Sequence, residues 1–212
     1  MDADHDLELT GRETCYDGFF RLDRFHLRHR RFDGSWTPVL DREVVLRRPA
    51  VAVLPYDPDL DRVVLLEQFR PAAYAAGRPA WMTEIPAGLV EFGEALPAVA
   101  AREVKEETGL AVEALEPVAE FMPSPGGFAE VVTLFVGRVD ASNAGGIFGV
   151  DAEHEDIRSF TMDAAEALAL MAVPGRIDNA IALIAFQWLA LNREALRRRW
   201  RSSGRQSPGH GS

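Results

Sequence analysis

Apolar and polar residues alternate along the first part of the chain, and this period of two predicts β-structure over residues 7–47. The alternation is clearest over residues 19–29. The pair Asp33-Gly34 then predicts a hairpin turn that leads into a strand at 35–39. We therefore expect an N-terminal antiparallel β subdomain at residues 1–48, which could also act as an arm that pairs with a second subunit.

The later pattern alternates between strands of the buried type and amphipathic helices. We expect strands at residues 42–46, 50–56, 63–69, 81–85, 112–121, 131–139 and 157–161, and helices at 94–108, 162–171 and 178–200. Strands mixed with a few helices favour an α/β (α+β) sandwich over residues 49–201, in which helices flank a mixed β-sheet core. The stretch 140–154 is expected to be a long loop, and the tail 202–212 to be disordered.

Composition narrows the function classes. The chain has 212 residues, a net charge of −10 and one cysteine, Cys15. The acidic balance argues against broad binding to nucleic acid or to an anionic membrane. A single cysteine excludes an internal disulfide and a cysteine-based zinc site. Because no apolar leader segment and no apolar run of about 18 residues is present, we expect a cytoplasmic protein.

The stretch of residues 88–110, GLVEFGEALPAVAAREVKEETGL, carries the chemistry. It predicts a helix with Pro97 in its first turn and Gly109 just past its end. Glu103 and Glu107 are four residues apart and therefore lie on one helix face. Two such carboxylates repel each other unless a cation lies between them, and oxygen-only ligands suit Mg²⁺ or Mn²⁺.

Arg102 and Glu106 are also four residues apart on this helix. We expect them to pair, which would orient the acidic cluster. The alternative is an exposed helix whose charged residues form ordinary surface ion pairs. The register of Gly88 and Glu94 with the run REVKEETGL favours the metal site.

The same register resembles the Nudix box, a loop–helix–loop that holds divalent metal for hydrolysis of nucleoside diphosphates linked to another group. Flanking segments are similar to the ADP-ribose pyrophosphatase branch of that superfamily. They read RETCYDGFF, LEQFRPAAY, SPGG, EHEDI and RIDNAIALIAFQWL, and they extend over most of the chain. Pro125, fifteen residues after Leu110, matches a proline of that branch.

The resemblance implies a set of metal ligands and a general base. The ligands are the backbone carbonyl of Ala87 and the carboxylates of Glu103, Glu107 and Glu155. Glu153 corresponds to the base that acts on the attacking water. The alternative for residues 153–155 is a solvated acidic turn. His154, which lies between the two glutamates, is interpreted as incidental, because a strand-like alternation would point it the other way.

The resemblance also implies contacts to substrate. Arg42 and Arg70 match positions that contact the diphosphate and neighbouring groups, and the arginine fork pairs well with phosphate oxygens. The alternative is that both are ordinary surface arginines. Phe19 matches a ring that stacks on adenine and that a swapped N-terminal arm contributes, which implies a homodimer. The alternative for Phe19 is a core phenylalanine beside Phe20.

Together these matches imply metal-dependent hydrolysis of ADP-ribose to AMP and ribose 5-phosphate, with Mg²⁺ or Mn²⁺ as the cofactor. The partner is then a small nucleotide sugar, and neither nucleic acid nor a membrane is expected. Two alternatives stay open. One is a hydrolase of another nucleoside diphosphate sugar, such as GDP-mannose. The other is a non-catalytic ADP-ribose sensor, although such sensors usually carry a DNA-binding domain or a broken box.

Overall fold

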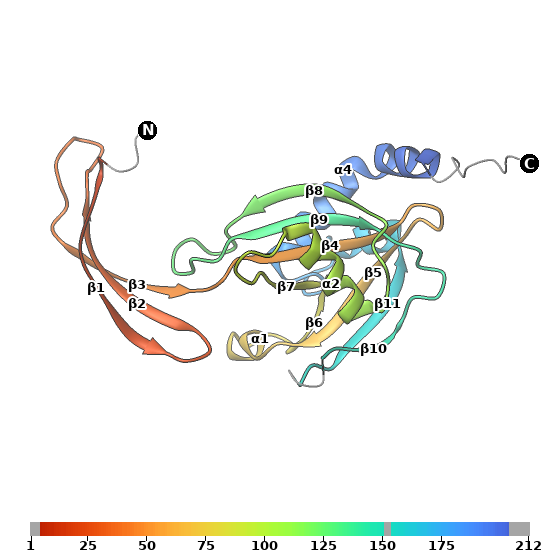
Figure 1. Cartoon of the computed structure of the whole chain (residues 1–212), viewed down its shortest axis with the longest axis horizontal. Coiled ribbons are helices and arrows are strands. Elements are labelled where there is room, and N and C mark those ends of the chain that lie inside the picture. The colour runs from red at the N-terminus through yellow and green to blue at the C-terminus, as the bar shows by residue number, and fades with distance from the viewer. Residues whose placement is uncertain (1–4, 151–153, 204–212) are drawn as a thin grey trace, which may run out of the picture. The chain divides into compact units, whose positions relative to one another are not determined.

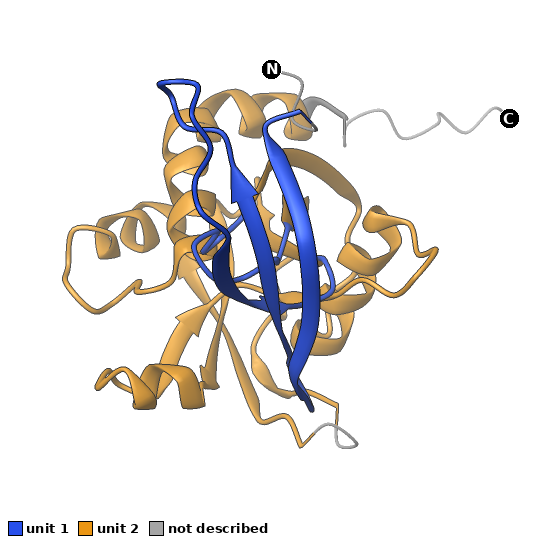
Figure 2. Cartoon of the chain, turned by 90° about the vertical axis from the view of Figure 1, so that its left-hand side faces the viewer, with its two compact units in different colours: residues 1–49, 122–131 blue, residues 50–121, 132–212 orange. Residues whose placement is uncertain are grey.

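The computed structural model describes residues 5–150 and 154–203, and the chain divides into two compact units. Unit 1 comprises residues 1–49 and 122–131, and unit 2 comprises residues 50–121 and 132–212 (Figure 2). The pattern of the sequence did not indicate that residues 122–131 belong with the N-terminal section.

Unit 1 contains a three-stranded antiparallel sheet in the order β1-β2-β3 (Figure 1). Its strands are β1 (Leu7–Asp17), β2 (Arg21–His29) and β3 (Leu40–Leu46). The expected N-terminal antiparallel subdomain is therefore confirmed. The strand expected at residues 35–39 is wrong: beyond Asp33-Gly34 the chain forms only an isolated bridge, between Arg30 and Trp36. Pro38 has no N–H to donate, so a ladder cannot continue through it.

The second segment of unit 1 bonds to the end of β3. The N–H of Val45 donates to the carbonyl of Gly127 (2.8 Å), and the N–H of Ala129 donates to the carbonyl of Val45 (2.9 Å). Arg47 and Glu130 form an ion pair in which Nε and Oε1 are 3.1 Å apart. These contacts join two segments that are far apart in the sequence.

Unit 2 is built on a mixed eight-stranded sheet. Its strands are β4 (Ala50–Asp57), β5 (Arg62–Phe69), β6 (Trp81–Glu84), β7 (Ala87–Leu89), β8 (Ala114–Phe121), β9 (Val132–Arg138), β10 (Gly146–Phe148) and β11 (Ile157–Asp163). The order is β10-β11-β5-β4-β9-β8, with β6 paired to β5 and β7 paired to β4. The pairing of β4 with β9 is parallel, and the other pairings are antiparallel.

The helices of unit 2 are α1 (Pro71–Ala75), α2 (Leu96–Thr108), α3 (Ala164–Leu170) and α4 (Ala180–Ser203) (Figure 1). All eight residues of the central strand β4 are buried. Because side chains alternate along a strand, Val51 and Val53 belong to the cluster that includes residues of α2, whereas Ala52 and Leu54 belong to the cluster that includes residues of α4. The expected sandwich of a mixed sheet flanked by helices is confirmed.

Several boundaries differ from the expectations. The helix expected from residue 94 begins at Leu96, since the carboxylate of Glu94 accepts the N–H of Glu91 (2.8 Å) and closes a turn before the helix. The helix expected from residue 162 begins at Ala164, because β11 continues to Asp163 in its pairing with β5. The short elements α1, β7 and β10 were not anticipated.

At the end of the chain, the last helix is longer than expected. Helix α4 forms one continuous element to Ser203, and the tail 204–212 lies outside the described residues. No helix in the described part of the chain is long and apolar enough to span a membrane.

Candidate metal and substrate site

The candidate site begins with helix α2, whose ends follow from its sequence. Pro97 lies in the first turn, where a missing N–H costs little. Gly109 ends the helix in a left-handed conformation (φ 73°), and its N–H donates to the carbonyl of Lys105 (3.0 Å). The buried face carries Val99 and Val104 beside two carboxylates. One helix face thus supplies packing along its length and acidic groups near its end.

Those carboxylates belong to Glu103 and Glu107, which are only 8% and 4% exposed. The strand β7 lies beside them. The N–H of Ala87 donates to Oε2 of Glu107 (3.2 Å), and a Cβ added to Gly88 would overlap the carboxylate of Glu103. The structure therefore brings Ala87, Glu103 and Glu107 together, at the junction of β7 and α2.

Burial raises the pKa of Glu107 to about 9, and the charge of Glu103 is the second cause. The N–H of Ala87 and the charge of Arg70 act in the opposite direction. A carboxyl group in this environment holds its proton at neutral pH unless a cation offsets the cost of ionising it. The pair therefore has the electrostatic character of an acidic site that a cation would complete.

Arg102 supplies positive charge at the edge of this pair. Its Nη1 lies 2.8 Å from Oε1 of Glu103 and 3.1 Å from Oε2 of Glu106. The ion pair expected between Arg102 and Glu106 is present, and it is the more exposed of the two contacts. The guanidinium group thus links the buried carboxylate of Glu103 to the helix surface.

The donor atoms fit a hard divalent cation. The two carboxylates offer oxygen alone, and Gly88 leaves space for the Glu103 carboxylate against the backbone of the loop. The described residues contain no ready cluster of three or more histidine, cysteine, aspartate or glutamate side chains that could hold a metal.

The loop after β10 carries the two remaining acidic predictions. Glu155 lies at its end, where Oε2 accepts the N–H of Val150 (3.1 Å) and its own N–H reaches the carbonyl of Val150 (3.4 Å). The carboxylate is therefore bonded to the backbone of Val150, although its charge still contributes to the raised pKa of Glu107. Glu153 lies outside the described residues.

His154 does not lie in a strand, so the alternation expected to orient its ring does not apply. His154 has a positive φ of 55° and lies in a turn, and the strand begins only at Ile157. Alternation along a strand therefore does not determine where its ring points.

Arg70 follows β5 and lies near the acidic site. Its Nε (2.9 Å) and Nη2 (2.7 Å) both donate to Oε2 of Glu84 on β6. Burial tends to lower the pKa of Arg70, but the contact with Glu84 and the charges of Glu107 and Glu155 leave it raised overall. Glu84 was not among the residues chosen from the sequence. The available signal was a carboxylate in a short strand that is otherwise uncharged, WMTE.

Phe19 and Arg42 belong to unit 1. The ring of Phe19 is 86% exposed and makes an edge contact with Phe20, with centroids 4.9 Å apart. The alternative of a core phenylalanine is therefore wrong. Arg42 is exposed on β3, where its Nη1 donates to the carbonyl of Asp41 (2.8 Å).

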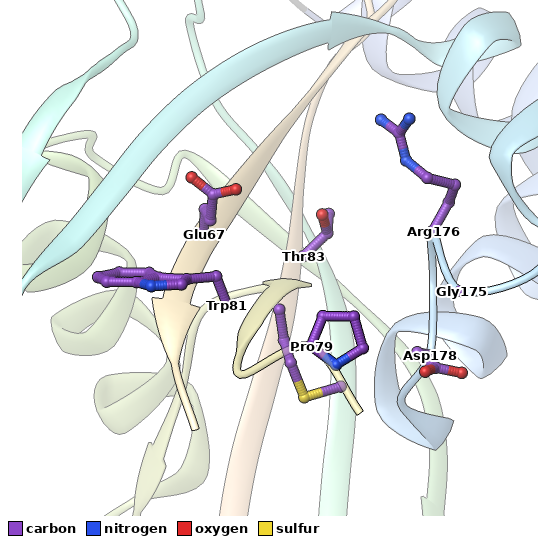
Figure 3. Close-up of a pocket in the computed structure, with 8 residues that line it drawn as sticks. Glu67, Pro79, Trp81, Thr83, Gly175, Arg176 and Asp178 are labelled. Carbon is purple, nitrogen blue, oxygen red and sulfur yellow. The ribbon is translucent and has the colours of Figure 1, made fainter. Parts of the chain in front are cut away.

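A separate pocket of about 180 Å³ lies beside β5 and β6 and the segment before α4. Figure 3 shows Glu67, Trp81 and Thr83 on the strands, with Arg176 and Asp178 on the opposite side. Both acidic groups are paired with arginines outside the lining, since Glu67 contacts Arg158 and Asp178 contacts Arg78. None of the described residues predicted for metal or substrate lines this pocket, so it is not the predicted site.

A mixed sheet between helical layers, with a helix that presents two buried carboxylates to a glycine-containing loop, defines a Nudix-type hydrolase. The chain belongs to this family: the NUDIX domain family matches residues 46–180. The resemblance seen in the sequence is thereby confirmed.

Two relatives place the chain within the family, and one solved structure shares its fold. It is 44% identical to the ADP-ribose pyrophosphatase of Escherichia coli (strain K12), over 92% of this chain and 93% of the relative. It is 38% identical to the GDP-mannose pyrophosphatase of Cronobacter sakazakii (strain ATCC BAA-894), over 71% of this chain and 78% of the relative. The crystal structure of an ADP compounds hydrolase superimposes with a TM-score of 0.67 at 19% identity. That match covers 88% of this chain and 96% of the other and bears on the fold alone.

Proposed function

We propose that the protein hydrolyses the diphosphate bond of ADP-ribose and releases AMP and ribose 5-phosphate. The observation that carries this proposal is the buried pair Glu103 and Glu107, held against Ala87 and Gly88. The similarity to an ADP-ribose pyrophosphatase over 92% of the chain supports the choice of substrate.

We propose Mg²⁺ as the cofactor, with Mn²⁺ as the alternative. The carbonyl of Ala87 and the carboxylates of Glu103, Glu107 and Glu155 would hold the metal. When bound, a divalent cation neutralises the phosphate charge and makes a water molecule more acidic. The all-oxygen donor set and the raised pKa of Glu107 support this assignment.

The chain's own groups would then divide the work. Glu153 would accept the proton of the attacking water, whose oxygen bonds to one phosphorus as the bridging P–O bond breaks. Arg70 and Arg42 would bind the diphosphate oxygens, to which an arginine donates in a fixed geometry. Arg102, with Glu106, would hold the carboxylate of Glu103 in place, a role that its 2.8 Å contact supports.

A coupled assay tests the substrate. ADP-ribose resists a phosphomonoesterase because each of its phosphates carries one sugar ester and the shared anhydride bond, which leaves no terminal phosphomonoester, whereas AMP and ribose 5-phosphate release phosphate. We expect phosphate release that requires Mg²⁺ or Mn²⁺, stops in EDTA, and shows its highest kcat/KM for ADP-ribose within a panel of nucleoside diphosphate sugars.

The same panel decides between the alternatives. Similarity to a GDP-mannose pyrophosphatase favours that sugar as the second candidate substrate, although the match covers less of the chain. Equal or faster turnover of GDP-mannose would overturn the choice of ADP-ribose. Tight binding of ADP-ribose without turnover would instead identify a sensor.

We also propose a homodimer in which unit 1 packs on a second copy and Phe19 stacks on the adenine. Among the described residues of unit 1, Asp23 alone is buried, and apolar side chains such as Leu9 and Tyr16 are more than half exposed. A sheet of three strands without an apolar core needs a covering surface.

Light scattering at micromolar concentration tests this assembly, and a monomer would contradict it. Phe19→Ala should raise KM for ADP-ribose by about tenfold, the loss expected for one stacking contact. Phe32→Ala is the matched control, because Phe32 is a fully exposed ring of the same unit and should leave KM unchanged. We also propose a cytoplasmic location, which cell fractionation would test.

A further inference from the structure

The contact between Arg70 and Glu84 indicates a role for Glu84 in the candidate site. Both Nε and Nη2 of Arg70 donate to one oxygen, Oε2 of Glu84, at 2.9 and 2.7 Å. The side chain of Glu84 is 14% exposed and that of Arg70 is 42% exposed. A charge-assisted hydrogen bond between partly buried groups is stronger than one on the surface, and its geometry is more fixed.

Hydrogen bonds hold the backbone of Arg70 in place, so only the side chain of this residue is free to change its conformation. The N–H of Arg70 donates to the carbonyl of Ala80 (2.7 Å), and its carbonyl accepts the N–H of Ala73 (3.1 Å) at the start of α1. Glu84 is itself fixed by the pairing of β6 with β5, in which it lies opposite Leu66. The strand pairing therefore determines where Glu84 lies, and Glu84 determines where the guanidinium group points.

The direction matters because acidic groups of the candidate metal site lie near Arg70. The charges of Glu107 and Glu155 both act on it. Without Glu84, a flexible arginine beside two carboxylates could swing onto either of them. Glu84 occupies Nε and one edge of Nη2, while Nη1 has no hydrogen-bond partner among the described residues. The cation therefore keeps donors available for a ligand.

We propose that Glu84 is a positioning residue, which holds the guanidinium group of Arg70 in the orientation that binds the diphosphate of the substrate. This inference rests on the proposed function. Glu84 acts only through Arg70, and it saves the entropy that ordering a long side chain would otherwise require at each binding event. The same logic applies to groups that orient the ligands of a metal site.

A neighbouring pair offers a matched control. Glu67, on the adjoining strand β5, contacts Arg158 with nearly the same geometry: Nε and Nη2 donate to Oε2 at 2.9 and 2.6 Å. That pair is more exposed, at 36% for Glu67 and 55% for Arg158, and it belongs to no proposed contact with metal or substrate. Glu67→Gln therefore removes an equivalent ion pair without touching the mechanism.

The test is a double-mutant cycle with Glu84→Gln, Arg70→Ala and the combined variant, in full-length protein with Mg²⁺ and ADP-ribose. Glu84→Gln should raise KM by about tenfold, the lower end of what losing an orienting partner costs. It should change kcat by less than about twofold, because a misplaced binding group weakens ground state and transition state alike. In the Arg70→Ala background, Glu84→Gln should have no further effect. Glu67→Gln should behave as wild type.

Each other result overturns the proposal. Additive effects in the cycle would mean that Glu84 acts independently of Arg70. A fall in kcat at unchanged KM would indicate loss of active protein, which a merely structural role predicts. Calorimetry with ADP-ribose and Ca²⁺ separates this inference from the proposed function. If wild type binds ADP-ribose in Ca²⁺ but shows no turnover in Mg²⁺, the proposed hydrolysis is wrong. An unchanged dissociation constant in Glu84→Gln would then overturn the role of Glu84 as well. If wild type does not bind ADP-ribose at all, both fail.

Discussion

Gly88 of β7 and Glu103 of α2 lie so close that a single methyl group on the glycine would overlap the carboxylate of the glutamate. The φ of Gly88 is not among the positive values that favour glycine, so its conformation does not require that residue. The requirement comes from space. The loop backbone must approach the carboxylate of Glu103, and only glycine permits it.

Gly88→Ala should therefore lower ADP-ribose hydrolysis by about a hundredfold or more, because displacing a catalytic group by about 1 Å costs that much. Circular dichroism should remain native. Combining Gly88→Ala with Glu103→Gln tests the cause: if both act through one carboxylate, the pair should be no worse than the poorer single variant. Full activity of Gly88→Ala would show that the approach is not needed.

Glu107→Gln should nearly abolish activity, by about 10³-fold or about 4 kcal/mol of barrier, and yet stabilise the protein in EDTA. The folded-state pKa of Glu107 is raised from 4.5 to about 9, so between these values the folded state holds a proton that the unfolded state has lost. Stability of wild type in EDTA therefore falls as pH rises through this window. The uncharged amide is free of that penalty.

Thermal melts at pH 5 and pH 8.5 in EDTA measure this directly. The melting temperature of Glu107→Gln should exceed that of wild type by a margin that grows with pH, to about 3–6 °C. Added Mg²⁺ should raise the melting temperature of wild type and not that of the variant. An equal or lower melting temperature of Glu107→Gln at pH 8.5 would contradict the raised pKa.

Glu153 and Glu155 are expected to differ in their response to metal. Glu153→Gln removes a base and should lower kcat with little change in KM. Glu155→Gln removes a ligand, so part of its loss should return as Mg²⁺ is raised. Titration of both variants with Mg²⁺ tests this division. Rescue of Glu153→Gln alone would reverse the roles, and normal activity in both would leave the loop as an acidic turn.

Asp61 should tie α4 to the β4–β5 turn through its charge. Its Oδ1 accepts Tyr56 Oη–H (2.7 Å) and Arg193 Nε–H (2.8 Å), and its Oδ2 accepts Arg197 Nη1–H (3.0 Å). The contact with Arg193 is the main reason that the pKa of Asp61 is lowered. A lowered carboxylate pKa contributes stability above its unfolded value of about 4 and loses it as pH falls further.

Asp61→Asn should therefore lower the melting temperature at pH 7 by about 4–8 °C, as expected for a mostly buried ion pair that loses one partner. The difference from wild type should narrow toward pH 3. Asparagine tolerates the positive φ of residue 61, so the substitution isolates the charge. Asp163→Asn, in the exposed pair with Arg62, is the control and should change the melting temperature little. A constant difference across this pH range would exclude the charge as the cause.

The sequence alone predicts those elements whose ends and buried faces are determined by residues close together in the chain. Helix α2 is an example, since Pro97 and Gly109 define its ends and the four-residue spacing places Glu103 and Glu107 on one face. The two-sided burial of β4 likewise follows from its apolar run. These features depend on periodicity, which one sequence shows directly.

Features that depend on contacts between distant segments could not be predicted in this way. Glu84 meets Arg70 only because β6 turns back along β5, and the spacing between the two residues does not reveal that pairing. The contact of Glu155 with Val150 is local, but it follows a stretch in which Gly145, Gly146 and Gly149 have positive φ, and such a stretch has no regular period from which the direction of a side chain could be predicted. The metal-binding role of Glu155 could be drawn only from the resemblance to a family.

The second segment of unit 1 has a consequence for the order in which the chain becomes structured during synthesis. The end of β3 bonds to residues 127 and 129, which leave the ribosome long after the first 49 residues. Domains usually fold from the N-terminus as they emerge, but the bridge at Val45 can form only after residues 127–129 have been made, which follow the acidic helix in the chain. Opposite β2, the edge of β3 is paired, within the described residues, only by the bridge between Val45 and Phe128, so a chain that stops at residue 121 would lose that bridge and expose the whole edge, which is a site for aggregation. Grafting this N-terminal sheet onto another enzyme of the family would accordingly require exchange of both segments together.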